Sequence, residues 1–136
     1  MIRKLTWIKI ILEDVQKIAD LDYQHRAWID EEFKCPCHFE ELMSSLYDSD
    51  SIEEFIETFE NSDEFTRHQI SNLKILHDKI EEFYYKPEIY FSNLPLKIDE
   101  RKVLADPEWH EIRSVAQQVL DAFKDFDIRE EPENDT

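Results

Sequence analysis

The chain of 136 residues contains no glycine. Glycine adopts positive φ more readily than any other residue, and it lets a backbone approach a ligand closely. Its absence excludes glycine-rich phosphate loops, the dinucleotide-binding fingerprint and the nucleophile elbow. It also disfavours the tight primed turns that join β-hairpins. Both consequences favour helices that are joined by polar or proline-containing loops.

Hydrophobic residues recur with the period of an α-helix along most of the chain. The supply of core residues is adequate, since 41% of residues are hydrophobic and nine are Phe. The sequence therefore predicts an all-α fold, a compact bundle of about five helices. We expect one helical domain over residues 1–126 and a flexible acidic tail over 127–136. The expected helices cover about 5–20 with a short continuation to 29, 38–46, 52–60, 63–85 and 107–123.

Capping residues mark several of these helix ends. Ser51, followed by Glu54, fits a capping box, and Asn61 to Glu64 offers a further N-cap. Asp106 followed by Pro107 is a strong helix start. Residues 86–105 then remain as a long connection, in which Tyr90, Phe91 and Leu94 are expected to pack over the core.

The sequence also predicts where the protein resides. No apolar stretch approaches the roughly 18 residues of a membrane span, and the basic start at Arg3 and Lys4 is not followed by the features of a signal peptide. Cys35 and Cys37 are too close in sequence for an ordinary structural disulfide. Reduced cysteines are typical of the cytoplasm, where we expect this protein.

Acidic residues are concentrated in one segment. The formal net charge is −17, and residues 35–66 contain no Lys or Arg. Ten carboxylates lie in this segment: Glu40, Glu41, Asp48, Asp50, Glu53, Glu54, Glu57, Glu60, Asp63 and Glu64. One interpretation is a solvated surface that keeps the protein soluble. The other is a binding face for a cationic partner, which the lack of interleaved basic residues favours.

We therefore predict an acidic partner-binding face in this segment. Nucleic acid and anionic membranes are disfavoured as partners, because no basic cluster exceeds a pair of residues. The predicted contact residues are Tyr47, as an aromatic anchor, with Asp48, Asp50, Glu53, Glu54, Glu57, Glu60, Asp63 and Glu64.

Catalytic and metal-binding motifs are weak in this sequence. The run from Cys35 to His38 offers thiolates and an imidazole, but a structural zinc site needs four ligands. Adjacent residues such as Cys37 and His38 rarely form a catalytic pair. A di-iron bundle needs Glu-x-x-His on two helices, and the chain has only a single Asp22-x-x-His25. We expect neither an enzyme nor a cofactor.

A short aromatic cluster leaves two interpretations open. Tyr23, Arg26 and Trp28 either stack and pair in the core or form an interface hot spot. In the structural interpretation, Arg26 pairs with a carboxylate such as Asp22 or Asp106.

Two short motifs resemble a family of small acidic bacterial proteins. They are Tyr23-Gln24-x-Arg26-x-Trp28 and Asp106-Pro107-x-Trp109, and the resemblance covers roughly residues 10–125. Similar proteins act as immunity proteins of toxin systems, including contact-dependent growth inhibition. The resemblance implies an immunity protein that binds and neutralises a cognate toxin, such as a nuclease with a basic cleft, through its acidic surface. The alternative is a general acidic adaptor or regulatory subunit for a basic protein.

Overall fold

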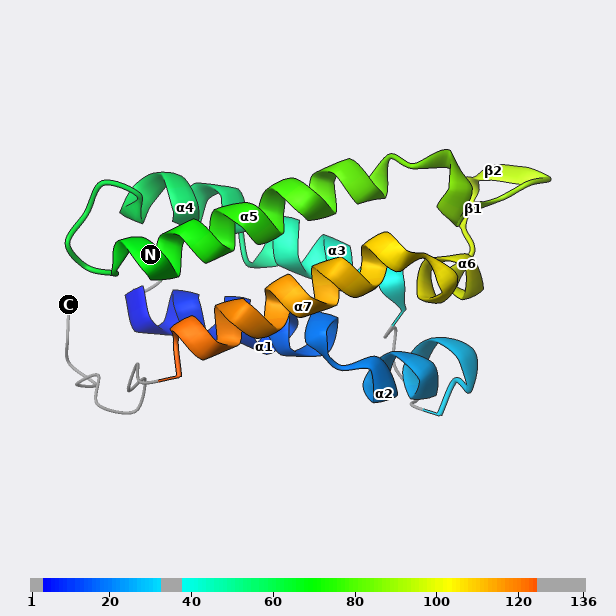
Figure 1. Cartoon of the computed structure of the whole chain (residues 1–136), viewed down its shortest axis with the longest axis horizontal. Coiled ribbons are helices and arrows are strands. Elements are labelled where there is room, and N and C mark those ends of the chain that lie inside the picture. Colours follow the sequence, from blue (N-terminus) through cyan, green and yellow to red (C-terminus); the bar gives the residue numbers. More distant parts are fainter. Residues whose placement is uncertain (1–3, 33–37, 125–136) are drawn as a thin grey trace.

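Three long helices form one layer of the fold. The computed structural model describes residues 4–32 and 38–124. Helix α7 (Pro107–Ala122) packs against α1 (Lys4–Ala19) on one side and α5 (Arg67–Tyr84) on the other. Figure 1 shows these helices running side by side. The predicted all-α class is confirmed, with a single two-stranded sheet added within the described residues.

Shorter helices complete the bundle. α4 (Ile52–Phe59) packs against α5. α3 (Phe39–Ser44) continues directly into a π-helical turn, η2 (Ser45–Ser49). After α1, α2 (Leu21–Gln24) likewise continues into a second π-helical turn, η1 (His25–Ile29), which confirms the expected continuation of the first helix.

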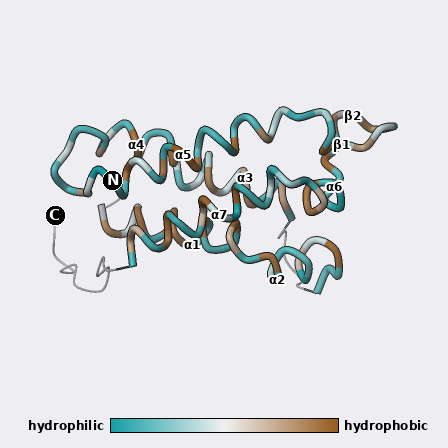
Figure 2. Tube along the Cα trace, viewed as in Figure 1, coloured by the Kyte–Doolittle hydropathy of each residue, from teal (hydrophilic) through white to brown (hydrophobic). Residues whose placement is uncertain are grey.

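The core is the one that the helical period predicts. Figure 2 shows hydrophobic and hydrophilic residues alternating along the long helices. An aromatic cluster lies in this core, formed by Trp28, Phe39, Phe83 and Trp109. The ring centroid of Trp109 lies 5.5 to 6.0 Å from those of the other three residues. Because aromatic rings bury large areas, this cluster ties η1, α3, α5 and α7 into one core.

The start of α5 differs from the prediction. The helix begins at Arg67 and not near Asp63, because Thr66 is the N-cap. The Thr66 hydroxyl accepts a hydrogen bond from the Gln69 backbone at 3.0 Å, and the Gln69 side chain accepts one from the Thr66 backbone at 2.9 Å. This reciprocal capping box satisfies two backbone groups at once.

The predicted capping box at Ser51 is wrong. Ser51 lies in the left-handed region with φ of 50°, and its side chain makes no capping hydrogen bond to α4. Its hydroxyl instead donates to the backbone oxygen of Asp48 at 3.3 Å. Because the Ser51 hydroxyl is bonded to the preceding turn, it does not cap the following helix.

The segment predicted as a long connection has structure of its own. It contains a 3₁₀ turn, two antiparallel strands and a short helix, namely η3 (Pro87–Ile89), β1 (Tyr90–Phe91), β2 (Leu94–Ile98) and α6 (Glu100–Ala105). The hairpin projects from one end of the bundle (Figure 1). Tyr90 packs on the core, whereas Leu94 is 52% exposed, so its expected burial is wrong.

None of the helices in the described part of the chain combines the length and the hydrophobicity that crossing a bilayer requires. Cys35, Cys37 and the predicted acidic tail 127–136 lie outside the described residues.

Candidate functional site

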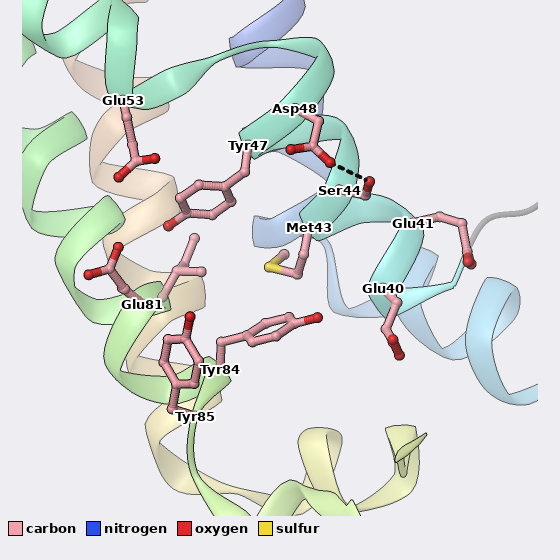
Figure 3. A pocket seen from close by; sticks show the side chains of 11 residues that line it. Glu40, Glu41, Met43, Ser44, Tyr47, Asp48, Glu53, Glu81, Tyr84 and Tyr85 are labelled. Atoms are coloured by element: carbon pink, nitrogen blue, oxygen red, sulfur yellow. Dashed lines mark hydrogen bonds between the residues drawn. The ribbon is translucent and has the colours of Figure 1, made fainter. Parts of the chain in front are cut away.

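An acidic groove lies between α5 and the segment formed by α3, η2 and α4 (Figure 3). Its cavity volume is about 590 Å³, which is within the usual range for ligand sites. Eleven residues line it: Glu40, Glu41, Met43, Ser44, Tyr47, Asp48, Glu53, Ile80, Glu81, Tyr84 and Tyr85. Met43 and Ile80 are buried and belong to the core, so the groove has an apolar base.

Five of the lining residues are carboxylates, and none of the described lining residues is Lys or Arg. They come from four elements. α3 supplies two of them, η2 supplies Asp48, α4 supplies Glu53, and α5 supplies Glu81. Only Asp48 receives a hydrogen bond from another lining side chain, the Ser44 hydroxyl at 3.1 Å (Figure 3). The groove therefore concentrates negative charge in a partly enclosed space.

Tyr47 forms part of the groove wall. Its hydroxyl donates a hydrogen bond to the backbone oxygen of His77 at 3.2 Å, and its ring lies 5.5 Å from the His77 ring. Burial, followed by the nearby charges of Glu81 and Glu53, raises the pKa of Tyr47 above its ordinary value. The phenol therefore stays neutral, and it fixes the wall to α5.

Tyr84 and Tyr85 form the opposite end of the groove. Tyr84 stacks on Phe39 with ring centroids 6.1 Å apart, which holds its ring in place. Burial raises the pKa of Tyr84, so its hydroxyl also stays protonated. Tyr85 contacts Tyr84 edge-on at 5.9 Å and is 76% exposed. An aromatic ring this exposed beside carboxylates is available for contact with a ligand.

A mixed cluster of ligating side chains lies at the α4 side of the groove. His77 Nε2 is 3.1 Å from Glu53 Oε2 and 3.6 Å from Glu81 Oε2. His77 Nδ1 is 3.1 Å from Asp78 Oδ1. Burial lowers the pKa of His77, but hydrogen bonds with Asp78 and Glu53 outweigh burial and raise it.

The structure divides the predicted contact residues into groups. Tyr47, Asp48 and Glu53 line the groove. Glu54 and Glu57 are exposed on α4 but lie outside the groove. Three further acids lie near the start of α5. Glu60 forms an ion pair of 2.6 Å with Lys74, Asp63 lines a second pocket together with Arg67, and Glu64 is exposed. The fold thus places a basic residue, Lys74, beside an acid that lies 14 residues earlier in the sequence.

Asp50 does not belong to the exposed face, and its prediction as a charged contact is wrong. It is 3% exposed, and the Trp7 indole donates a hydrogen bond to its backbone oxygen at 2.6 Å. Burial, and then hydrogen bonding and repulsion from Asp14, raise the pKa of Asp50 to about 8. Asp50 therefore acts inside the fold and not on its surface.

Sequence reasoning missed the α5 wall of the groove. Glu81 and Tyr85 follow His77 at intervals of four residues. This spacing places His77 and Glu81 on one helix face, with Tyr85 directly after the helix end. That pattern was visible in the sequence. What was not visible is that this face lies opposite α3 and η2, about 40 residues earlier in the chain.

Carboxylates and tyrosine rings together suit a cation. Carboxylates accept charge-assisted hydrogen bonds from Lys or Arg, and tyrosine faces attract the same groups through cation–π contact. The groove thus presents the groups that a cation would contact. No protein-family model, curated protein sequence or solved structure matches the chain.

Proposed function

We propose that this protein binds a basic protein partner, and that the groove receives Lys or Arg side chains of that partner. The observation that carries the proposal is the lining of the groove, with five carboxylates, three tyrosines and no basic residue among the described residues that form it. Helices hold these groups in place, so little conformational entropy is lost when a partner binds.

An arginine side chain fits the chemistry of the groove best. Its planar guanidinium stacks on aromatic faces and pairs with carboxylates through two parallel hydrogen bonds. Tyr85 offers an exposed ring directly after the end of α5, and Glu81 lies four residues before it in the last turn of the helix. The apolar base formed by Met43 and Ile80 would contact the aliphatic part of the side chain.

The partner that we propose is a bacterial toxin, which makes this protein an immunity protein. Two observations support this choice: the resemblance of the motifs around Trp28 and Trp109 to small acidic bacterial proteins of this kind, and the net charge of −17. A nuclease toxin needs a basic cleft for its substrate, and an acidic groove complements such a cleft. Charge complementarity also speeds association, which a cell exposed to a toxin requires.

A general acidic adaptor is the competing function. Glu54 and Glu57 extend the negative surface beyond the groove, as diffuse attraction to several basic proteins would require. An adaptor of that kind depends on net charge. A specific immunity protein depends on the position of its charges and rings.

Charge reversal at matched positions tests this difference. The partner is captured from cells of the source organism with the tagged protein, purified, and titrated against two double variants. Glu53→Lys with Glu81→Lys changes the groove, and Glu54→Lys with Glu57→Lys changes the outer surface of α4 by the same charge. The proposed function predicts that the groove variant loses affinity by about a hundredfold or more, since buried charge contacts carry several kcal/mol. The α4 variant should lose much less.

A growth assay tests the immunity role directly. Expression of the captured partner alone should arrest a bacterial host, and co-expression of the wild-type protein should restore growth. The groove variant should fail to restore growth although it is folded by circular dichroism. Equal loss of affinity in both double variants, with several partners released at moderate salt, would support the adaptor instead.

A further inference from the structure

Three side chains with electron-pair donors converge on one point beside the groove. We propose that Glu53, His77 and Glu81 form a binding site for a divalent transition-metal ion, with Zn²⁺ as the ion that fits best. The ligands come from α4 and from two successive turns of α5. One atom of each lies within 4.8 Å of the other two. Figure 3 shows the carboxylates of Glu53 and Glu81 turned toward the same side of the Tyr47 ring.

The distances match a metal coordination sphere. Zinc binds histidine nitrogen and carboxylate oxygen at about 2.0–2.2 Å, so neighbouring ligand atoms of a tetrahedral site lie roughly 3.4 Å apart. His77 Nε2 lies 3.1 Å from the Glu53 oxygen and 3.6 Å from the Glu81 oxygen. The two distances from His77 are thus close to the spacing that a bound ion imposes, and the two glutamate oxygens lie within 4.8 Å of each other.

The orientation of the imidazole favours a metal at Nε2. Asp78 Oδ1 lies 3.1 Å from His77 Nδ1, where its carboxylate accepts a hydrogen whenever that nitrogen is protonated. Nε2 is hydrogen-bonded to Glu53 in the metal-free protein, and once it gives up its hydrogen its lone pair points toward the two glutamates. A carboxylate that holds the second nitrogen of a histidine ligand is a recurring feature of metal sites, where it fixes the ring and increases its basicity.

Three electron-pair donors this close repel one another unless positive charge lies between them. A proton on Nε2 forms a hydrogen bond to the nearer carboxylate, Glu53 at 3.1 Å, while the exposed Glu81 at 3.6 Å interacts with it only through charge. A divalent ion accepts electron pairs from both carboxylates and from the imidazole together. Imidazole among the ligands favours zinc and similar ions over Mg²⁺, which prefers oxygen ligands and keeps its water.

The site is rigid on one side and accessible on the other. The His77 side chain is only 16% exposed, and the carbonyl oxygen of the same residue accepts the hydrogen bond of Tyr47. Glu53 and Glu81 are each more than half exposed, so the ion can enter from solvent. Three protein ligands leave a fourth position for water or for a group of a bound molecule.

The isolated protein suffices to test this site. Zn²⁺ binding is measured by isothermal titration calorimetry with purified, metal-free protein, in wild type and in two matched pairs of variants. Glu53→Gln is compared with Glu54→Gln, and Glu81→Gln is compared with Glu82→Gln. Each pair removes the same charge from neighbouring positions of one helix, and all four side chains are exposed.

The proposal predicts one saturable Zn²⁺ site in the wild type. Glu53→Gln and Glu81→Gln should each weaken binding about tenfold or more, whereas Glu54→Gln and Glu82→Gln should change it less than about twofold. Mg²⁺ at the same concentration should not displace Zn²⁺. No saturable binding, or equal weakening within each pair, would overturn the proposal and indicate diffuse attraction of cations to an acidic surface.

Asp78 is a positioning residue in this proposal, and it provides a second readout. Asp78→Asn should weaken Zn²⁺ binding about tenfold, and it should change the ¹⁵N chemical shifts of the His77 ring in the Zn²⁺ complex. In the wild type, Zn²⁺ should shift Nε2 and leave Nδ1 protonated. A Zn²⁺-induced shift at another histidine, with none at His77, would refute the assignment. Because no partner is present, failure here leaves the proposed function untouched.

Discussion

The indole nitrogen of Trp109 donates a hydrogen bond of 2.9 Å to the side-chain oxygen of Gln24 in the interior of the protein. The side-chain nitrogen of Gln24 donates in turn to the backbone oxygens of Lys17 and Ile18, at 2.8 and 2.7 Å. Gln24 is fully buried. One amide thus satisfies the C-terminal end of α1 and joins it to the first turns of α7.

Replacing Gln24 by Ala should lower the free energy of unfolding by about 2–4 kcal/mol. The change leaves the Trp109 indole and two carbonyl oxygens without their partner, and unsatisfied buried polar groups cost about 1–3 kcal/mol each before the structure relaxes. Urea denaturation monitored by tryptophan fluorescence measures the loss. Gln16→Ala, on the exposed side of α1, should change stability by less than about 0.5 kcal/mol. Similar losses in both variants would contradict this role.

The sequence motifs are explained by this contact. The first of the two motifs that resemble small acidic bacterial proteins contains Gln24 and Trp28, and the second contains Trp109. These three residues meet in the core. Arg26 pairs with Glu32 at 3.0 Å and with Asp22 at 3.6 Å, while Asp106 pairs with Lys86. Of the two carboxylates expected for Arg26, only Asp22 is therefore its partner.

Helices and their buried faces were predictable because each depends on a local period. The second expected helix, 38–46, has hydrophobic residues at the helical period, and all four of them are buried: Phe39, Leu42, Met43 and Leu46. Contacts between distant segments were not predictable. The Lys74 that neutralises Glu60 lies 14 residues away, and the carboxyl of Asp14 that approaches Asp50 lies 36 residues earlier. Counting charges along the sequence therefore included carboxylates that the fold pairs or buries in the predicted acidic face, and it did not reveal the groove.

Glu100 should control the ionisation of His38. Its carboxylate lies 2.9 Å from His38 Nδ1 and also accepts the backbone hydrogen of Phe39 at 2.7 Å. The hydrogen bond to Glu100 raises the pKa of His38 more than burial lowers it. The protonated pair therefore adds stability below the unfolded pKa of about 6.5, and that stability is lost as pH rises through the higher folded pKa.

Glu100→Gln tests this coupling, because a neutral amide cannot stabilise the imidazolium as a carboxylate does. The pKa of His38, measured by NMR titration of its ring protons, should fall toward about 6.5 in the variant. Glu40→Gln removes a neighbouring exposed charge and should leave the pKa of His38 nearly unchanged. An unchanged titration in Glu100→Gln would show that another group controls His38.

Tyr85 should contribute to binding and not to folding. Its side chain is 76% exposed, whereas Tyr84 stacks on the buried ring of Phe39. Tyr85→Ala should change the free energy of unfolding by less than about 0.5 kcal/mol but weaken partner binding by about tenfold or more. Tyr84→Ala should cost stability, on the order of 1–3 kcal/mol. Affinity that is unaffected by Tyr85→Ala would exclude this ring from the interface.

Asp50 should make the protein less stable as pH rises. Its Oδ2 atom is buried and receives no hydrogen bond from any donor in residues 4–32 and 38–124, while its neighbour Asp14 accepts a hydrogen bond from Ser45 at 2.6 Å. A proton on Asp50 allows a hydrogen bond with Asp14 and removes the repulsion between the two carboxylates. This arrangement, together with burial, raises the pKa of Asp50 from 3.8 to about 8.

The folded protein therefore keeps a proton that the unfolded chain releases above pH 3.8, so the Asp50 contribution to stability falls progressively until about pH 8. The loss is on the order of several kcal/mol, since each pKa unit corresponds to about 1.4 kcal/mol. Asp50→Asn mimics the protonated acid with a permanent donor. Urea denaturation between pH 4 and 8 should show the variant gaining stability relative to wild type as pH rises. Asp48→Asn, an exposed neighbour, should parallel wild type, and parallel curves for Asp50→Asn as well would refute the proton on Asp50.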